Sequence, residues 1–276
     1  MLTIIEVLKA ILFGVVEGIT EWLPISSTGH MILLDEFVKL NVSKEFLDLF
    51  LVVIQLGAIL AVVVIYWNKL IPLSTKHGLH ISRRKCKMWV KIIVASIPAG
   101  VVGILWDDVF TKYFYNYQTV AIMLILVGVV FIIIERSNKN KIAKIDSIDD
   151  ISYGQAFLIG VFQMIAAIFP GTSRSGSTIV GSLMLGISRT AAAEFTFFLA
   201  VPAMFGGSAI KILKYSGGFN SAEVALLAIG MIVAFVLSII AIKFLMSYIK
   251  KHDFKVFGWY RIVLGIAVIG YFLATR

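Results

Sequence analysis

Two carboxylates near the start of the chain, Glu17 and Glu21, are the first residues whose type and spacing could do chemistry. They are four positions apart, so a helix would place both side chains on one face, one turn apart. Their neighbours are mostly apolar, and a carboxylate in such surroundings needs a cation, a proton or a hydrogen-bonding partner. A hydrogen bond to a neighbouring helix, or a side chain that snorkels to the membrane surface, is the structural alternative.

The segment that follows these carboxylates combines hydroxyl groups with a titratable ring. It reads Pro24-Ile25-Ser26-Ser27-Thr28-Gly29-His30. Proline and glycine interrupt a helix, and the three hydroxyls are candidate nucleophiles or substrate ligands with His30 as a titratable partner. Serine and threonine at a helix break also cap the next helix, and a lone histidine can be a satisfied core residue, so a structural interpretation stays open for each.

A second break has the composition of a phosphate site and reads Pro170-Gly171-Thr172-Ser173-Arg174-Ser175-Gly176-Ser177-Thr178. Its glycines let backbone amides approach a ligand, and Arg174 offers a planar fork that matches phosphate oxygens. An ion pair from Arg174 to Glu17 or Glu21 is the alternative, and it can coexist with phosphate binding. The ending of a Walker A loop is absent. We expect the substrate ligands to be Ser26, Thr28, Gly171, Thr172, Ser173, Ser175 and Thr178.

The elements that carry these residues must lie in lipid. Of 276 residues, 59% are hydrophobic and 15% are charged, and the mean hydropathy is +0.95, which is far from the composition of a soluble domain. Two apolar stretches, 3–40 and 151–188, contain the breaks. Other apolar runs, each near the ~20 residues that cross a bilayer, lie at 46–67, 88–106, 118–135, 190–214, 221–249 and 256–274. We predict an all-α, polytopic membrane protein of one domain, with six spanning helices and two re-entrant, broken-helix hairpins.

Composition argues against several other classes of protein. The net charge of +9 is distributed over separate loops rather than gathered into one patch, so nucleic-acid binding is not expected. Cys86 is the only cysteine, which excludes an intrachain disulfide. The sequence contains no Cys/His cluster of the kind that binds zinc or haem.

Basic loops indicate the orientation in the membrane. The loop 68–91 contains seven lysine or arginine residues, and the positive-inside rule places it in the cytoplasm. The basic loops 136–150 and 250–255 fall on the same side only if 151–188 enters the membrane and returns. The same reasoning for 3–40 leaves both chain ends outside, with 107–117 and 215–220 outside as well.

The two halves of the chain, approximately 1–146 and 147–276, resemble each other at an offset of 146 residues. Glu17 aligns with Gln163, Pro24 with Pro170, Ser27 with Ser173, and Asp48 with Glu194. Three spans separate the hairpins, so the second half is expected to be inverted relative to the first. Inverted repeats with discontinuous helices form substrate sites near the midplane of membrane proteins, where helix N-termini can face an anion. For Asp48 and Glu194 we expect helix-end or interhelical contacts.

The motifs around both breaks resemble those of the undecaprenyl-diphosphate phosphatase family of the bacitracin-resistance type. The resemblance includes the segments 17–30, 55–60, 170–178 and 188–195, and extends over nearly the whole chain. It implies hydrolysis of undecaprenyl diphosphate to undecaprenyl phosphate and inorganic phosphate at the outer face of the cytoplasmic membrane. Such a reaction recycles the lipid carrier of cell-wall synthesis and confers bacitracin resistance. A divalent cation, Mg²⁺ or Ca²⁺, is also implied.

The residues support this chemistry but leave its details open. Glu17 and Glu21 are the expected metal ligands, or one ligand and one base, and Arg174 would stabilise the phosphoryl group in transfer. Ser27 as nucleophile with His30 as acid/base, and a metal-activated water supported by His30, are the two alternatives. The main rival function is a flippase or transporter of a polyprenyl phosphate, because inverted repeats are typical of alternating access. The oligomeric state stays open.

Overall fold

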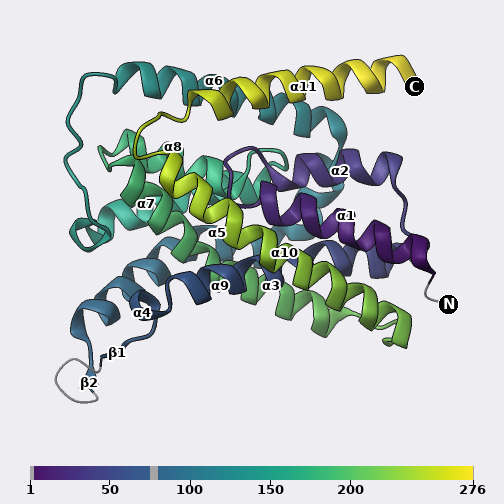
Figure 1. Cartoon of the computed structure of the whole chain (residues 1–276). Helices are drawn as coiled ribbons and strands as arrows, with labels where there is room; N and C mark the ends of the chain where they lie inside the picture. Colours follow the sequence, from purple (N-terminus) through teal and green to yellow (C-terminus); the bar gives the residue numbers. More distant parts are fainter. Residues whose placement is uncertain (1–2, 75–79, 276) are drawn as a thin grey trace.

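The computed structural model describes residues 3–74 and 80–275, and nearly all of its regular structure is helical (Figure 1). Six of the described helices are long and apolar enough to cross a membrane. They are α3 (Lys44–Ile65), α5 (Arg83–Phe114), α6 (Tyr117–Ser137), α9 (Arg189–Lys214), α10 (Ser221–Tyr248) and α11 (Lys255–Thr275). The predicted all-α fold with six spans is confirmed, and the chain is a multi-pass membrane protein.

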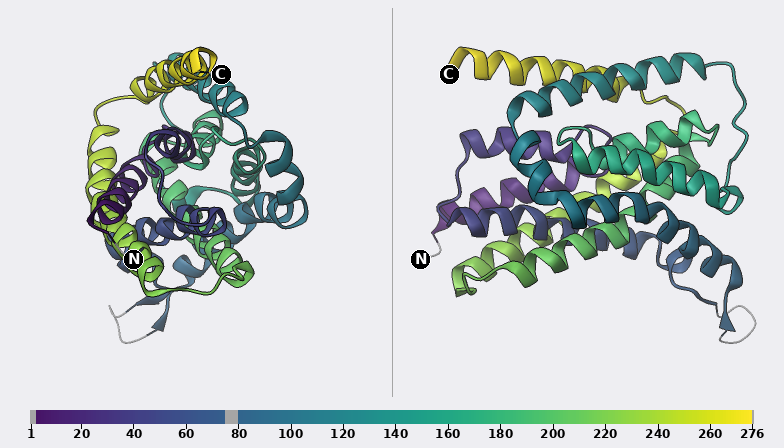
Figure 2. Two further views of the ribbon diagram at one scale, coloured as in Figure 1. Left: turned by 90° about the vertical axis from the view of Figure 1, so that its right-hand side faces the viewer. Right: turned by 180° about the vertical axis from the view of Figure 1, so that it is seen from behind.

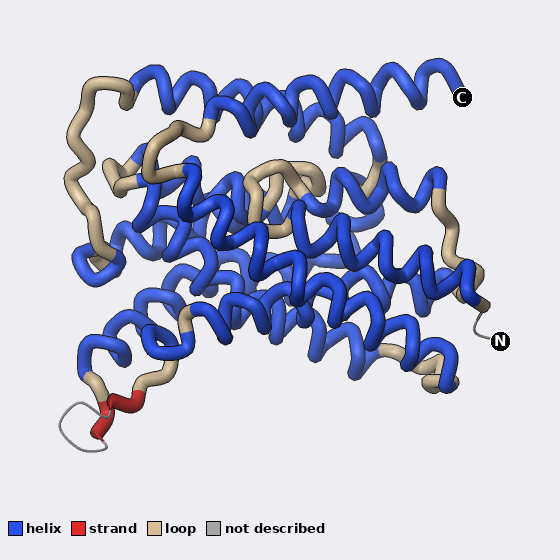
Figure 3. The backbone as a smooth tube through the Cα atoms, viewed as in Figure 1, coloured by secondary structure: helices blue, strands red, loops and turns tan. Residues whose placement is uncertain are grey.

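The two broken stretches each form a pair of shorter helices. They are α1 (Ile4–Thr20) with α2 (Ser27–Phe37), and α7 (Tyr153–Ile168) with α8 (Arg174–Met184). Helices α2 and α8 have 11 residues each, which at ~1.5 Å per residue is about half the thickness of a bilayer core. The loop that joins α1 to α2 lies in the middle of the molecule, surrounded by helices (Figure 3). Both breaks therefore occur where the sequence predicted them.

The connections differ from the predicted loops in two places. The expected loop 107–117 is mostly helix, because α5 continues to Phe114 and α6 begins at Tyr117. An apolar run marks only the part of a helix that lies in lipid, and the helix can extend past it into the interface. The expected loop 68–91 contains α4 (Trp67–Leu70), the start of α5, and a two-residue antiparallel ladder of β1 (Leu73–Ser74) with β2 (His80–Ile81). A single turn of 3₁₀ helix, η1 (Ile148–Asp150), precedes α7.

The first helix of each half packs against a helix of the other half. Helix α1 packs against α10, and α7 packs against α5. A Cβ atom at Gly14 would lie 2.7 Å from the carbonyl oxygen of Gly230, and one at Gly160 would lie 2.2 Å from that of Ala95. Both contacts need glycine, because a larger residue would push the helix axes apart. Gly14 and Gly160 are also equivalent at the predicted offset of 146 residues.

The basic loops gather at one end of the molecule and the described chain ends at the other. Figures 1 and 2 show the loop between α6 and α7, the loop between α10 and α11, and the β1–β2 ladder at the end opposite the two termini. Helices α6 and α11 lie side by side and contact the other helices partly through α2 and α8. Trp22, fully buried beside the first break, makes an edge-on contact with Phe197 of α9, with ring centroids 5.3 Å apart. This contact holds the first break against α9.

Candidate active site

The first break is built around an unusual backbone conformation at Ser26. Helix α1 ends at Thr20, and Pro24 follows within the turn that separates it from α2. Ser26 has a φ of 75°, in a region that non-glycine residues rarely adopt. Its hydroxyl accepts a hydrogen bond from the Gly29 amide at 3.3 Å and caps α2. The side chain of Ser26 is thus used by the fold, as the structural interpretation of this residue expects.

The second break repeats this geometry. Ser173 has a φ of 69°, and its hydroxyl accepts from the Gly176 amide at 3.1 Å to cap α8. Ser26 and Ser173 are therefore structural equivalents, 147 residues apart, and Ser27 corresponds to Arg174. The predicted alignment of Ser27 with Ser173 is wrong by one residue, because two residues separate Pro170 from its cap Ser173 and only one separates Pro24 from Ser26.

Both breaks line one cavity of about 180 Å³. The first break supplies a carboxylate and two hydroxyls, and the second supplies a guanidinium, a hydroxyl and a glycine backbone. The lining residues are Glu21, Ser27, Thr28, Gln55, Ala166, Pro170, Gly171, Ser173 and Arg174. Residues separated by about 150 positions in the sequence therefore meet in a small polar space within the helices.

Glu21 is the centre of this cavity because it contacts both breaks. One carboxylate oxygen accepts from the Ser27 hydroxyl at 2.5 Å, and the other accepts from Nη2 of Arg174 at 2.6 Å. Side-chain exposure is 8% for Glu21 and 17% for Arg174, so this ion pair is largely withdrawn from solvent. Within the described chain, Nη1 of Arg174 is buried and has no hydrogen-bond acceptor. That nitrogen is free to bind a ligand.

Backbone amides at both breaks are also free. Helices α2 and α8 begin at the cavity, and the amides of Ser27, Thr28, Arg174 and Ser175 have no acceptor among the described residues. Such amides at a helix N-terminus favour an anion, through both their hydrogens and the helix dipole. Two helix N-termini thus converge on the space beside Arg174.

Glu17 lies one turn before Glu21 and is 1% exposed. Neither of its carboxylate oxygens has a hydrogen-bond donor in the part of the chain that the structure describes. A buried carboxylate without a donor is costly, and a cation or a proton would satisfy it. The pair therefore fits a divalent cation by the chemistry of its oxygen donors. No cluster of three or more His, Cys, Asp or Glu residues suited to a metal is found among the described residues.

His30 does not line the cavity. Its Nδ1 donates to the carbonyl oxygen of Ser26 at 2.7 Å, since a carbonyl can only accept. In the neutral ring, Nε2 then accepts from the hydroxyl of Tyr260 at 2.7 Å. The two rings are nearly parallel, with centroids 5.7 Å apart. The structure therefore assigns His30 two partners outside the Glu21–Ser27 pair.

The remaining predicted ligands lie behind the cavity wall. Ser175 donates to the backbone carbonyl of Glu21 at 3.2 Å, and Thr178 donates to that of Arg174 at 2.9 Å. Both side chains are buried, and so is Thr172, whose hydroxyl has no partner among the described residues. These residues join or surround the breaks rather than face the cavity.

Three residues near the site were not among the sequence candidates. Gln55 of α3 lines the cavity, Tyr260 of α11 contacts His30, and Arg261 of α11 is fully buried between the breaks. A charge inside the apolar run 256–274 was a usable signal for Arg261, because intramembrane charges are rare and usually functional. Gln55 lies in a segment that carried the family resemblance, and nothing in the sequence singled out Tyr260.

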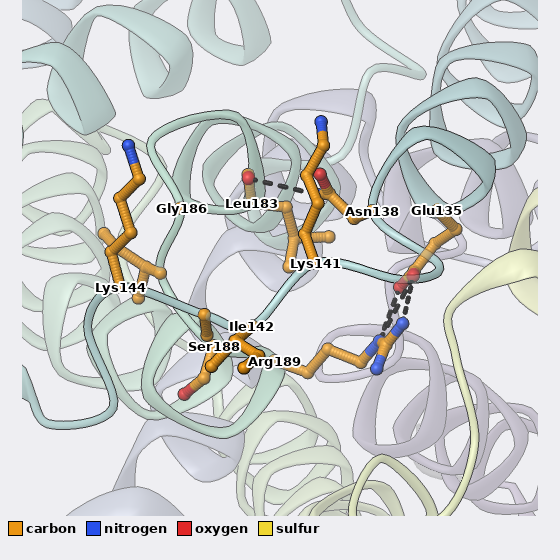
Figure 4. Close-up of a pocket in the computed structure, with 11 residues that line it drawn as sticks. Glu135, Asn138, Lys141, Ile142, Lys144, Leu183, Gly186, Ser188 and Arg189 are labelled. Atoms are coloured by element: carbon orange, nitrogen blue, oxygen red, sulfur yellow. Dashed lines mark hydrogen bonds and ion pairs between the residues drawn. The ribbon is translucent and has the colours of Figure 1, made fainter.

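A second cavity of about 110 Å³ lies where α6, α8 and α9 end or begin (Figure 4). Arg189 forms an ion pair with Glu135 in its wall, with Nε to carboxylate distances of 2.9 and 3.2 Å. Glu135 also accepts from the Phe254 amide at 3.1 Å. The paired charges join α6, α9 and the start of α11, which is a structural role. Glu194 likewise pairs with Lys69 at 2.5 Å, as expected for an interhelical contact.

Comparisons with known proteins agree with the motifs. The family model described as bacitracin resistance protein BacA matches residues 10–267. A protein of Desulfitobacterium hafniense named undecaprenyl-diphosphatase is 63% identical over 99% of this chain and 98% of its own length. Undecaprenyl-diphosphatase 1 of Clostridium acetobutylicum is 62% identical over 98% of each chain, and an undecaprenyl-diphosphatase of Enterococcus faecalis is 58% identical over 97% of this chain and 98% of its own.

A match of this extent, from residue 10 to residue 267, includes both helix breaks and every residue of the cavity wall. The chain belongs to the BacA family of bacitracin resistance proteins.

Proposed function

We propose that this chain hydrolyses undecaprenyl diphosphate to undecaprenyl phosphate and inorganic phosphate. The observation that carries the proposal is the contact of Ser27, Glu21 and Arg174 in one cavity. These groups are a hydroxyl with an adjacent proton acceptor and a cation suited to phosphate. The relatives named undecaprenyl-diphosphatase, matched over nearly their full length, support the substrate.

Phosphate recognition is assigned to the second break and to the two helix N-termini. Arg174 would turn from Glu21 to the terminal phosphate, to which Nη1 can donate without losing another contact. The free amides of both breaks would bind the remaining oxygens. In phosphoryl transfer most catalysis comes from positioning and from compensation of charge on the transferred group, which is what these donors provide.

Ser27 is the proposed nucleophile. Its oxygen attacks the terminal phosphorus, its proton passes to Glu21, and the bond from that phosphorus to the bridging oxygen breaks. Undecaprenyl phosphate leaves with the bonding electrons. Water then hydrolyses the phosphoserine and releases inorganic phosphate, and the proton returns to Ser27. The 2.5 Å contact favours Glu21 over His30 as the proton acceptor, since His30 is bound to Ser26 and Tyr260.

Direct attack by water is the alternative, and isotope labelling separates the two routes. If Ser27 attacks, a substrate labelled with ³²P in the terminal phosphate transiently labels the protein, and Ser27→Ala abolishes that label. If water attacks directly, Ser27→Ala keeps a measurable rate and no label forms at any time.

A divalent cation is proposed at Glu17 and Glu21. The support is the buried Glu17 carboxylate without a donor and its position one turn from Glu21. The cation would compensate the negative charge of the carboxylates and of the diphosphate, which otherwise repel each other.

The site is proposed to open to the outer face of the cytoplasmic membrane. The family resemblance implies this face. The gathering of the basic loops at the end opposite the termini supports the orientation of the chain, because by the positive-inside rule that end is cytoplasmic. We also propose that the two halves form an inverted repeat. The position of the basic loops supports it, and so do the matched helix caps at Ser26 and Ser173. In addition, the first helix of each half packs on a helix of the other half, α1 on α10 and α7 on α5.

The decisive experiment is phosphate release from a long-chain prenyl diphosphate by purified protein in detergent, with Arg189→Lys as a control far from the cavity. Phosphate release by the original chain that is lost in Glu21→Gln supports the proposed phosphatase activity. Tight binding of the diphosphate without any phosphate release would favour the transporter instead.

A further inference from the structure

Arg261 of α11 is a fully buried arginine that contacts both helix breaks. Its Nη1 donates to the carbonyl oxygen of Pro24 in the first break at 3.2 Å. Its Nη2 donates to the carbonyl oxygens of Gly171 and Thr172 in the second break, each at 2.8 Å. A longer contact of 3.5 Å reaches the carbonyl of Met123. One side chain thus connects segments that are about 150 residues apart in sequence.

No carboxylate pairs with Arg261 in the described chain. A buried cation without a counter-ion is expensive, so its four carbonyl partners must compensate much of the lost hydration. Three of these carbonyls also depend on Arg261 for a hydrogen bond. The carbonyl oxygens of Pro24, Gly171 and Thr172 lie where the helices are broken, and in the part of the chain that the structure describes they have no other donor.

The contact with Thr172 sets the direction of a neighbouring amide. In a trans peptide the C=O and N–H of one peptide unit point in opposite directions. Since the carbonyl of Thr172 points to Arg261, the amide of Ser173 points away from Arg261. Ser173 lines the cavity, and its amide has no acceptor among the described residues. Arg261 therefore holds this amide in a fixed direction on the wall of the phosphate site.

Two glycines make room for this arrangement. Gly171 has a φ of +89°, and a Cβ there would lie 2.5 Å from the carbonyl oxygen of Val120, so the turn that exposes its own carbonyl needs glycine. A Cβ at Gly176, in the first turn of α8, would lie 3.2 Å from Nη1 of Arg261. The guanidinium thus lies directly against the helix start that carries Arg174.

From these contacts we infer that Arg261 is a positioning residue for phosphate binding. It fixes the second break relative to the first, so that the Ser173 amide and the Arg174 guanidinium face Ser27 and Glu21. The inference rests on the proposed function, because the group it positions is the proposed phosphate site. Arg261 itself acts through backbone carbonyls and does not touch substrate.

The test uses Arg261→Lys, which keeps the charge but cannot bridge both breaks with a planar fork. Arg189→Lys is the matched control, since Arg189 also joins helices through a buried partner but lies at the other cavity (Figure 4). Unfolding temperature, kcat and KM for a prenyl diphosphate, and Kd for inorganic pyrophosphate are measured on each protein. We expect Arg261→Lys to raise KM and the pyrophosphate Kd at least tenfold, whereas Arg189→Lys lowers the unfolding temperature and leaves both constants unchanged.

A folded Arg261→Lys protein with the KM and Kd of the original chain overturns the inference, and so does an equal rise in Arg189→Lys. If Arg261→Lys does not fold, Gly176→Ala decides. Its Cβ would lie 3.2 Å from Nη1 of Arg261 and 3.2 Å from Cβ of Ser173, so the guanidinium or Ser173 must shift slightly, while alanine favours the helix. A pyrophosphate Kd that is raised in Gly176→Ala and does not rise further in the double variant Gly176→Ala, Ser173→Ala supports the inference, and an unchanged Kd in Gly176→Ala overturns it.

The pyrophosphate readout also separates this inference from the proposed function. An original chain that binds pyrophosphate but releases no phosphate from prenyl diphosphate contradicts the phosphatase alone, and the Kd comparison then decides the role of Arg261. An original chain that releases phosphate but does not bind pyrophosphate leaves the phosphatase standing, and the KM comparison between Arg261→Lys and Arg189→Lys then decides the role of Arg261.

Discussion

Nη2 of Arg174 donates to the Glu21 carboxylate at 2.6 Å, so the cation proposed to bind phosphate has a partner within the protein. Phosphate must compete with Glu21 for Arg174. The more highly charged diphosphate competes better than a phosphate monoester, because Coulomb attraction increases with charge. We therefore expect Glu21 to recover Arg174 as the less charged inorganic phosphate leaves, so that the ion pair assists product release.

Replacement of Arg174 should impair catalysis far more than folding. Arg174→Lys keeps the charge but loses the bidentate fork, and Arg174→Ala loses both. We expect the alanine variant to lose at least about a hundredfold in rate, on the order of 3 kcal/mol of transition-state stabilisation, and the lysine variant to lie between it and the original chain. Phosphate release and unfolding temperature are measured on the same preparations.

A purely structural ion pair predicts a different pattern for these variants. The unfolding temperature would fall, and any folded Arg174→Ala protein would release phosphate at the normal rate. That result would contradict the proposed role of Arg174 in binding phosphate.

Glu17→Gln tests the proposed cation site. Glutamine keeps the shape of the side chain but removes its charge, so activity should fall and the Mg²⁺ or Ca²⁺ concentration for half-maximal activity should rise at least tenfold after treatment with chelator. Gln163→Met is the control, since Gln163 is the equivalent buried residue in the second half. An unchanged cation titration in Glu17→Gln, with activity retained, would return Glu17 to a structural role.

Tyr260→Phe tests whether the partner of His30 matters for turnover. Phenylalanine preserves the ring stacking and removes only the hydroxyl that binds Nε2. His30 also donates to the carbonyl oxygen of Ser26, next to the proposed nucleophile, so the loss of one hydrogen bond of ~1 kcal/mol should lower kcat by roughly fivefold, with little change in unfolding temperature. A double-mutant cycle with His30→Ala checks the coupling. Additive effects in that cycle would show that Tyr260 acts independently of His30.

The two-hairpin topology predicts a pattern of thiol labelling. In a Cys86→Ser background, single cysteines at 115–116 and 216–219 should react with an impermeant reagent from outside the cell. Cysteines at 251–253 should react only after permeabilisation. Labelling at 251–253 from outside would contradict the hairpins and the inversion of the second half.

The spanning helices were predictable because lipid imposes a simple requirement on sequence. Backbone groups in hydrocarbon must be satisfied within a helix, so an apolar run of about 20 residues has one structural outcome. Helix ends outside lipid follow no such rule, which is why α5 continues to Phe114 instead of ending near residue 106. The offset of 146 holds for Gly14 and Gly160 but fails at the caps, because the second turn has one more residue between its proline and its cap.

The contacts of the site could be predicted from the sequence only where both partners are side chains. The opposite charges and the break motifs indicated that Glu21 and Arg174 could pair, and the ion pair is present. Arg261 recognises backbone carbonyls, and a carbonyl belongs to every residue, so no pattern of residue types indicates which ones are used. The partner of His30 was hidden for a similar reason, since contact with Tyr260 depends on how α11 is placed against α2.

The place of Arg261 in the last described helix has a consequence for biosynthesis. Both breaks are translated and can enter the membrane before α11 emerges from the ribosome, because residue 178 precedes residue 261. Until α11 arrives, the carbonyls of Pro24, Gly171 and Thr172 lack their shared donor. A nascent chain would therefore carry every proposed catalytic residue before the residue that positions the phosphate site is in place, and we expect the site to reach its full affinity for phosphate only at the end of insertion.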